Sequence, residues 1–139
     1  MPMVYMTHSS KYTSSAFTLV EIMVVVAIIA LLASIAVPNF LRARKRSQAT
    51  RILEDLRIID TAIDEYAIEN NKSGGASVVW TDIQAYLKKG SVLYNSAGMD
   101  LFGNLYVGFS VDSIPKLRST TFQKLSDVAP SDFWSPFYP

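Results

Sequence analysis

The feature that most constrains this chain is an uninterrupted apolar run near its N-terminus. Residues 17–37, FTLVEIMVVVAIIALLASIAV, contain only Thr18, Glu21 and Ser34 as non-apolar members. A helix of this length, rising ~1.5 Å per residue, is about 31 Å long and matches the roughly 30 Å hydrocarbon core of a bilayer. No polar stripe runs along the segment, so it differs from the one-sided surface helix of a globular protein. The segment is therefore expected to be a helix that enters a membrane.

Three interpretations of this helix follow from hydropathy alone. It is a cleaved secretory signal, for which Ser34-Ile35-Ala36 offers small residues at a suitable spacing. Alternatively it is a plain membrane anchor, or a helix through which copies of the chain assemble. Apolar composition does not separate the three, because each of them requires it.

Glu21 separates these interpretations better than hydropathy does. A carboxylate in an apolar span costs roughly 2.5–3.5 kcal/mol at the bilayer centre and less toward the interface, so it generally has a partner. No Lys or Arg lies within residues 17–37. A cut just before Phe17 would create an α-amino group one helical turn from Glu21, and such an amine on a neighbouring copy would neutralise the carboxylate. The alternative is a glutamate that lies at the headgroup level.

The hexapeptide Ala16-Phe17-Thr18-Leu19-Val20-Glu21, followed by an apolar helix, resembles the processing signal of type IV prepilins and type II secretion pseudopilins. The similarity covers about residues 14–42. It implies that prepilin peptidase cleaves between Ala16 and Phe17 and that the new N-terminus at Phe17 is methylated. It also implies that Glu21 contacts the N-terminal amine of an adjacent subunit during assembly. Residues 1–16 are then a cleaved leader, in which Ala16 replaces the glycine that the family usually carries.

The distribution of basic residues disagrees with this orientation. Four of the five residues 42–46 are Arg or Lys, whereas residues 1–16 contain only His8 and Lys11 as basic side chains. The positive-inside tendency would place residues 42–46 in the cytoplasm. The resemblance implies the opposite, with a single pass through the bacterial inner membrane and the C-terminal part in the periplasm. We follow the resemblance, because a dedicated peptidase reads the motif.

A second helical segment, residues 39–70, follows the assembly helix of residues 17–38. Pro38 removes a backbone hydrogen bond at the join and predicts a kink, or simply the end of the membrane span. Beyond it, apolar residues recur in steps of three and four and predict an amphipathic helix. The stripe comprises Ala49, Ile52, Leu56, Ile59, Ile63 and Tyr66, widened by Leu53 and Ala62. This helix is expected to end at Asn70 and to pack on a small domain.

That domain, residues 71–139, is expected to be a small periplasmic α+β unit, which gives a pilin-like fold class with a long helix packed on a small antiparallel sheet. We expect extended segments at 77–80, 91–94 and 105–111, short helices at 83–89 and 121–128, and an aromatic tail at 133–139 that packs its rings over the sheet. The turn Asp100-Leu101-Phe102-Gly103-Asn104, with Asp100 capping it, precedes the best strand candidate.

Two segments resemble the major pseudopilin of type II secretion, its G-type subunit. They are residues 58–72, at the end of the long helix, and residues 100–106, DLFGNLY. That family often binds calcium in a later loop through clustered aspartates. Here the candidates are Asp112, Asp127 and Asp132, which are widely spaced, whereas calcium needs six to eight oxygens. We therefore expect no cofactor, with calcium at these residues as the alternative.

Composition argues against catalysis. The chain has no cysteine, and its one histidine, His8, lies in the leader, so the commonest catalytic base is absent from residues 17–139. A net charge of +1 gives no reason to expect a nucleic-acid partner. The protein is therefore predicted not to be an enzyme.

The resemblance implies a pseudopilin that polymerises with itself and other pseudopilins into a periplasmic pseudopilus for type II secretion. It implies prepilin peptidase, an inner-membrane platform and an assembly ATPase as partners, besides the lipid bilayer. The alternatives are a type IV pilin for adhesion, motility or DNA uptake, and an anchored or secreted binding module. The absence of cysteine favours the pseudopilin modestly.

Overall fold

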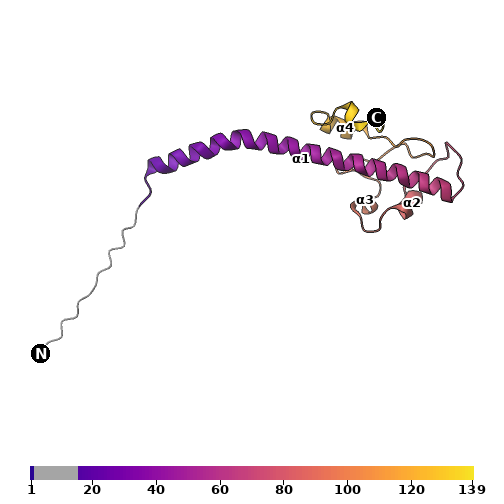
Figure 1. Cartoon of the computed structure of the whole chain (residues 1–139), viewed down its shortest axis with the longest axis horizontal. Coiled ribbons are helices and arrows are strands. Elements are labelled where there is room, and N and C mark those ends of the chain that lie inside the picture. Colours follow the sequence, from indigo (N-terminus) through magenta and orange to yellow (C-terminus); the bar gives the residue numbers. More distant parts are fainter. Residues whose placement is uncertain (2–15) are drawn as a thin grey trace. The chain divides into compact units, whose positions relative to one another are not determined.

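The computed structural model describes Met1 and residues 16–139, so all of the predicted leader except Met1 and Ala16 lies outside the described residues. One long helix, α1 (Leu19–Glu69), carries Pro38 within it and is followed by short helical segments. The described residues up to Pro38 form one compact unit, and Asn39–Pro139 form a second. Figure 1 shows α1 as the dominant element of the chain. The two units are described separately below.

In the second unit, the C-terminal half of α1 is a core helix on one face. Ile52, Leu56, Ile59 and Ile63 are all 1% exposed or less, as the spacing of the apolar stripe predicts. Ala49, Leu53, Ala62 and Ala67 are buried beside them, whereas Tyr66 is partly buried at the edge of this core. The helix ends at Glu69, one residue before the expected end, and Asn71 follows with a φ of 48°. The amphipathic half of the long helix is therefore confirmed.

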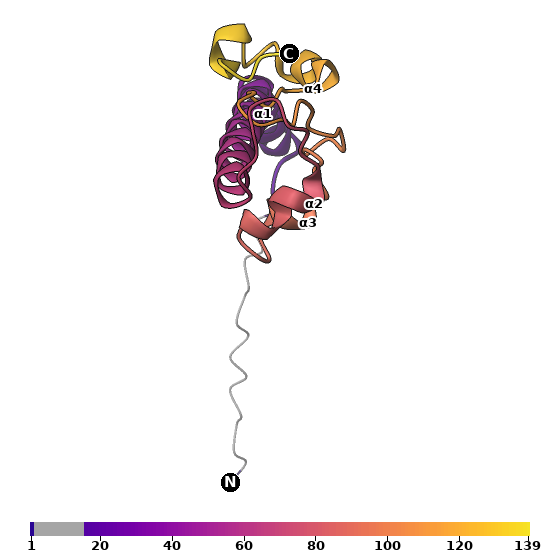
Figure 2. The same cartoon turned by 90° about the vertical axis from the view of Figure 1, so that its right-hand side faces the viewer.

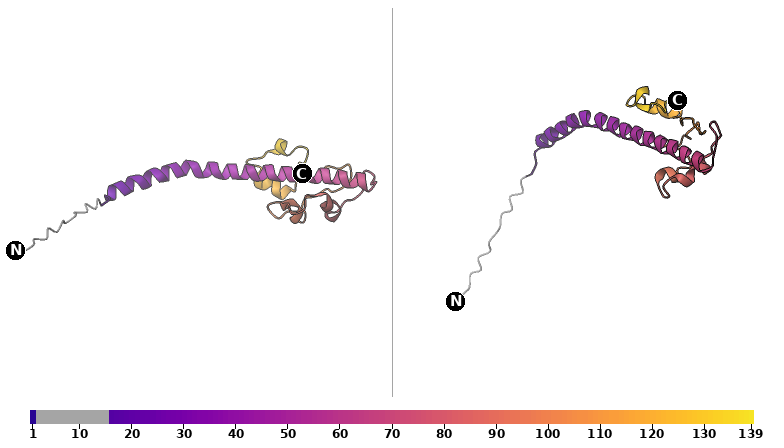
Figure 3. Two further views of the ribbon diagram at one scale, coloured as in Figure 1. Left: turned by 60° about the horizontal axis from the view of Figure 1, so that its bottom comes forward. Right: turned by 45° about the vertical axis from the view of Figure 1, so that its right-hand side comes forward.

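The remaining short elements are arranged around this half of α1. They are α2 (Trp80–Ile83), η1 (Gln84–Tyr86), α3 (Val92–Asn95), α4 (Ser119–Leu125) and η2 (Ser131–Trp134). Figures 1 and 2 show α2 and α3 on one side of α1 and α4 on the other. The two further views in Figure 3 also show α2 and α3 together on one flank of the helix. The core thus lies between one helix face and a wrapping chain of short segments.

The predicted antiparallel sheet is not confirmed. Within the described residues, extended segments meet only as isolated antiparallel bridges, which join Ser77 to Ser110, Met99 to Leu105, Val107 to Lys116, and Ser110 to Ser113. The expected strand at 105–111 contributes to all four bridges without forming a ladder. Gly108 has a φ of 81°, in the left-handed region, and this interrupts the extended backbone in the middle of the segment.

The strand predicted at 91–94 is wrong, because these residues begin helix α3. The Ser91 side chain accepts a hydrogen bond from the Tyr94 backbone N–H at 3.1 Å, which is the geometry of a helix N-cap. The expected helix at 83–89 is found earlier, as α2 and η1, and the Asp82 carboxylate accepts from the Val79 N–H at 3.1 Å. Helix α4 lies within two or three residues of its predicted bounds.

The turn at residues 100–104 is held by a buried polar cluster. The Asp100 Oδ1 accepts from the backbone N–H groups of Phe102 and Asn104 at 2.8 and 2.9 Å, so the carboxylate caps its own turn as predicted. Thr121, on α4, donates its hydroxyl proton to the other Asp100 oxygen, and the Asn104 side-chain amide donates to the Thr121 hydroxyl at 2.9 Å. Because Asp100 and Thr121 are both buried, this cluster fixes α4 to the turn.

The aromatic tail enters the core instead of covering a sheet. Trp134 is fully buried and Phe137 is 4% exposed. The Trp134 indole N–H donates to the Ala129 carbonyl at 3.0 Å, which satisfies the one polar atom of that side chain. The Leu117 N–H donates to the Phe137 carbonyl at 2.9 Å. The C-terminal residues therefore belong to the same hydrophobic core as the buried face of α1.

One pair of substitutions tests this packing. Ile63 is 1% exposed and Ile68, on the same helix, is 79% exposed. We expect Ile63→Ala to lower the free energy of unfolding by about 2–5 kcal/mol, because it removes buried carbon and leaves a cavity. Ile68→Ala makes the same chemical change on the exposed face and is expected to stay within about 0.5 kcal/mol. Denaturant unfolding followed by fluorescence of the buried Trp134 measures both; equal effects would show that the core is assigned to the wrong face.

Candidate functional site

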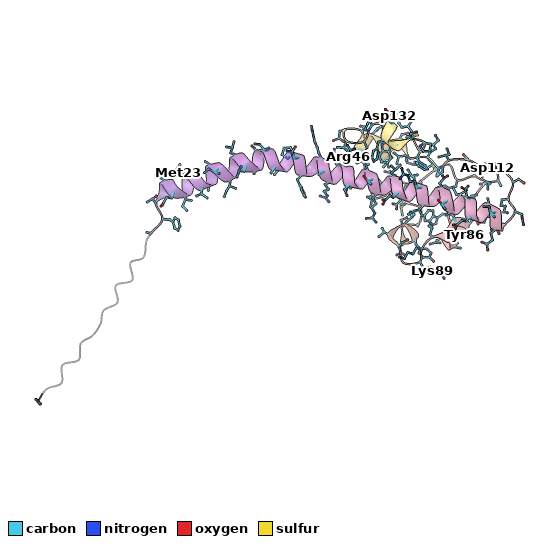
Figure 4. All side chains as sticks on the ribbon, in the orientation of Figure 1. Met23, Arg46, Tyr86, Lys89, Asp112 and Asp132 are labelled. Atoms are coloured by element: carbon cyan, nitrogen blue, oxygen red, sulfur yellow. The ribbon has the colours of Figure 1, made fainter. Side chains whose placement is uncertain are left out.

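The N-terminal half of α1 is apolar on every side. Its most apolar 18-residue window has a mean hydropathy of 2.9, and 0% of it is buried. Large apolar side chains from Phe17 to Val37 are each more than half exposed, and Figure 4 shows Met23 projecting outward among them. By length and composition this is one helix able to cross a membrane. Such a surface needs lipid or other helices around it.

Glu21 lies in the first turn of this helix, where Thr18 forms a capping box with it. The Thr18 backbone N–H and its hydroxyl both donate to Glu21 Oε2 at 2.8 Å. In return the Glu21 N–H donates to the Thr18 hydroxyl oxygen at 3.2 Å. Thr18 and Glu21 have the spacing of the S/T-x-x-E capping motif. The sequence therefore contained a signal for the capping box as well as for the charge of Glu21.

The capping box reduces the cost of placing the Glu21 carboxylate in an apolar medium but does not neutralise its charge. Hydrogen bonds from Thr18 replace part of the hydration that a carboxylate loses in an apolar medium, but they bring no positive charge. Among the described residues, the one salt bridge joins Lys45 to Asp127 and leaves Glu21 without a cation. Glu21 is exposed and available to a cation from outside the chain.

The other predicted site residues are Ala16, Phe17 and Pro38. Ala16 and Phe17 precede the first turn of α1 and are exposed. Pro38 lies inside α1, at the boundary between the two compact units. The kink predicted at Pro38 remains a prediction.

The calcium candidates do not come together. Figure 4 shows Asp112 and Asp132 in different parts of the second unit. Asp112 follows Val111, which accepts a hydrogen bond from Gly75 at 2.8 Å, whereas Asp127 pairs with Lys45 at 2.8 Å. Within the described residues, no three His, Cys, Asp or Glu side chains are grouped closely enough to hold a metal ion.

A hydrogen bond that the sequence gave no reason to expect ties the domain to α1. The Tyr106 hydroxyl donates to Asp55 Oδ2 at 3.2 Å, and Tyr106 is 5% exposed. Partial burial raises the pKa of the Asp55 carboxyl above its usual value, and the Tyr106 hydrogen bond opposes that rise. Burial, together with the nearby Asp55 charge, also raises the pKa of Tyr106, so the phenol stays protonated and remains a donor.

One known sequence motif coincides with this N-terminal segment. The model of the prokaryotic N-terminal methylation motif matches residues 12–37. The chain carries a prepilin-type N-terminus. This confirms the resemblance to type IV pilins and type II secretion pseudopilins on the segment that holds Ala16, Phe17 and Glu21.

Relatives of two kinds match the chain. The type IV major fimbrial protein FimA of Dichelobacter nodosus is 37% identical over 71 residues, which are 51% of this chain and 46% of that protein. The type II secretion system core protein G of Pectobacterium carotovorum is 36% identical over 63 residues, 45% of this chain and 40% of that protein. A second FimA sequence from Dichelobacter nodosus is 32% identical over 87 residues, 63% of this chain and 56% of that protein.

The chain thus matches about half of the length of these relatives. No solved structure matches it. The names of the relatives describe fimbrial and secretion-system proteins, which agrees with the prediction that the chain is not an enzyme.

The Tyr106–Asp55 hydrogen bond gives a prediction about pH. Because it lowers the pKa of Asp55, we expect Tyr106→Phe to raise that pKa further. A carboxyl whose folded-state pKa exceeds its unfolded value stabilises the fold below the unfolded pKa and loses that contribution as pH rises through the folded pKa. The variant should therefore lose more stability than the native chain on going from acid to neutral pH.

An NMR titration of the Asp55 carboxyl in the full chain in detergent micelles measures this pKa. Tyr86→Phe is the matched control, because the Tyr86 hydroxyl contacts Glu69 and Asn70 instead of Asp55. An unchanged or lower Asp55 pKa in Tyr106→Phe would contradict the role assigned to the hydrogen bond.

Proposed function

We propose that this protein is a pilin-type structural subunit, a pseudopilin that polymerises into the periplasmic pseudopilus of a type II secretion system. The observation that carries the proposal is Glu21, an exposed carboxylate on an uncovered apolar helix, inside a methylation motif and without a cation among the described residues. The uncovered helix supplies a surface for bundling, and the carboxylate supplies a point that fixes the register between neighbours.

Processing creates the partner for this carboxylate. Cleavage between Ala16 and Phe17 removes the leader, residues 1–16, and produces a secondary amine once Phe17 is methylated. That amine is positively charged at neutral pH. It lies one helical turn before Glu21 along the chain, so two subunits shifted by about one turn along the filament bring one subunit's amine to the other's carboxylate.

The rest of the chain takes its role from this arrangement. Residues 17–38 hold the subunit in the inner membrane and later line the filament axis. Residues 39–70 carry the periplasmic domain, residues 71–139, on one face of the same helix. Other pseudopilins join the polymer, prepilin peptidase processes the subunit, and a membrane platform with its ATPase drives extraction. Pro38 provides a helical position with one backbone hydrogen bond fewer, where the helix can bend on assembly.

A type IV pilus is the second candidate. The match to the fimbrial protein that covers 63% of this chain favours it, because that match extends farther than the match to core protein G. The absence of cysteine and the DLFGNLY turn favour the pseudopilin. Deletion of the gene distinguishes them, since a pseudopilin is required for protein secretion and a pilin for surface fibres.

Four variants separate the charge of Glu21 from its capping role. Glu21→Gln keeps an oxygen that can accept from Thr18 and removes the charge, whereas Thr18→Val removes the two hydrogen bonds of the Thr18 hydroxyl and keeps the charge. Glu21→Val removes the charge and both hydrogen bonds that Thr18 donates, and Thr18→Ser retains the charge and the hydroxyl. We expect Glu21→Gln and Glu21→Val to abolish filaments, and Thr18→Val to weaken the first helical turn by about 0.5–2 kcal/mol while filaments persist.

Filament yield and the mass of the mature N-terminus are measured for each variant. Membrane insertion and cleavage are expected to continue in all four, giving a chain that begins with methylated Phe17. Normal filaments from Glu21→Gln would overturn charge pairing as the driving contact. A native mature chain that begins at Val37 would indicate ordinary secretion, and an uncleaved leader would indicate a plain anchor; either result would reject the pilin-type function.

A further inference from the structure

The segment that follows the membrane helix is strongly cationic and has no acidic residue in its own sequence. Residues 42–51 contain Arg42, Arg44, Lys45, Arg46 and Arg51, and no Asp or Glu occurs between Glu21 and Glu54. Arginine and lysine at this density normally alternate with carboxylates on a solvated helix. Here their counter-charge must come from elsewhere in the chain, from a partner or from a membrane surface.

Among the described residues, only Lys45 of these five cations forms an ion pair. Lys45 pairs with Asp127 at 2.8 Å, and this hydrogen bond, together with the charges of Lys45 and Arg42, lowers the pKa of Asp127. The Arg46 guanidinium lies 5.9 Å from the centre of the Phe133 ring, a contact that brings no negative charge. Arg42, Arg44 and Arg46 are exposed, and within the described residues none of them forms a salt bridge.

The three arginines do not share one face of α1. At roughly 100° per residue, Arg44 is about 200° around the helix from Arg42, and Arg46 is about 40° from Arg42. A single acidic surface on a neighbouring protein contacts one side of a helix. Lipid headgroups surround a membrane helix on all sides, so they match this distribution better.

The local sequence also places this cluster at the end of the apolar surface. Phe40 and Leu41 are 68% and 51% exposed and immediately precede Arg42. A change from exposed apolar to exposed cationic side chains within one turn is typical of the boundary between hydrocarbon and headgroups, where arginine stems lie along the apolar region and guanidinium groups reach the phosphates.

We propose that Arg42, Arg44 and Arg46 form a collar that binds anionic phospholipid headgroups, with phosphatidylglycerol as the simplest example. The planar guanidinium donates two parallel hydrogen bonds to phosphate oxygens, which lysine cannot do. The collar fixes the depth of the subunit in the membrane and resists its extraction. This inference concerns the membrane-inserted subunit and does not depend on whether the chain later polymerises into a pseudopilus.

Electron spin resonance of the full chain reconstituted in phosphatidylcholine bilayers tests the collar. Trace spin-labelled phosphatidylglycerol or spin-labelled phosphatidylcholine reports how often each lipid is immobilised at the protein. One basic side chain close to an anionic headgroup strengthens the binding of that lipid by a factor of roughly five. Averaged over all lipids around the helix, we expect about a two- to fivefold preference for phosphatidylglycerol, which falls with added salt.

Three sets of variants assign the preference to these residues. The triple variant Arg42→Gln, Arg44→Gln, Arg46→Gln should show equal immobilisation of the two lipids. The corresponding triple Arg→Lys variant should retain most of the preference through charge. The matched control, Arg57→Gln, Lys88→Gln and Lys89→Gln, removes three exposed cations elsewhere in the same unit and should behave as the native chain. Near-ultraviolet circular dichroism of the buried tryptophan confirms that each variant is folded.

Two results would overturn the proposal. One is the absence of a phosphatidylglycerol preference in the native chain, or an equal loss of it in the matched control. The other is a triple glutamine variant with unchanged lipid selectivity that fails to form filaments. That second outcome would assign the arginines to carboxylates of a neighbouring subunit, and it differs from failure of the proposed function, in which the native chain forms no filament.

Discussion

Helix α1 carries two apolar surfaces of different shape, and the fold and the proposed assembly both depend on how each of them is covered. The C-terminal half is apolar along one stripe, so a small domain is enough to bury it. Ile52, Leu56 and Ile59 are fully buried by the short segments that wrap this face. The N-terminal half is apolar all round, and no wrapping segment of similar size exists within the described residues. Only a lipid bilayer or a bundle of identical helices offers a complete apolar surround.

In the proposed assembly, Glu21 determines which of these surrounds is the more favourable. In a bilayer its carboxylate keeps the hydrogen bonds from Thr18 but lacks a cation. In the proposed bundle of processed subunits it would keep those bonds and also gain a charged amine in a medium of low dielectric constant, where such a pair interacts strongly. The exchange of lipid contacts for helix contacts is close to neutral by comparison, because both surrounds are apolar. Charge pairing can therefore bias the equilibrium toward the filament. The proposed arginine collar would act in the opposite direction, because it would favour the inserted subunit.

The sequence predicted the features that depend on local periodicity and failed where they depend on packing between distant segments. The stripe from Ala49 to Ile63 and the Asp100 cap follow from spacing and turn chemistry, and both are found. The expected strand at 91–94 is helix α3, because Ser91 caps it, and short apolar runs do not distinguish the two. The hydrogen bond from Tyr106 to Asp55 joins residues 51 positions apart and has no local signal. At the site, Glu21 was recognised by its charge, while its reciprocal bonding with Thr18 was present in the motif and missed.

The central claim is that the Glu21 carboxylate of one subunit contacts the Phe17 amine of another in the filament. Solid-state NMR on filaments grown from an equal mixture of two subunits tests it directly. One subunit carries ¹⁵N at the Phe17 amine and the other carries ¹³C at the Glu21 carboxyl carbon, so only a contact between subunits produces dipolar coupling. The account predicts a coupling that corresponds to about 4 Å, the separation of an ion pair. Intact filaments without that coupling would contradict it.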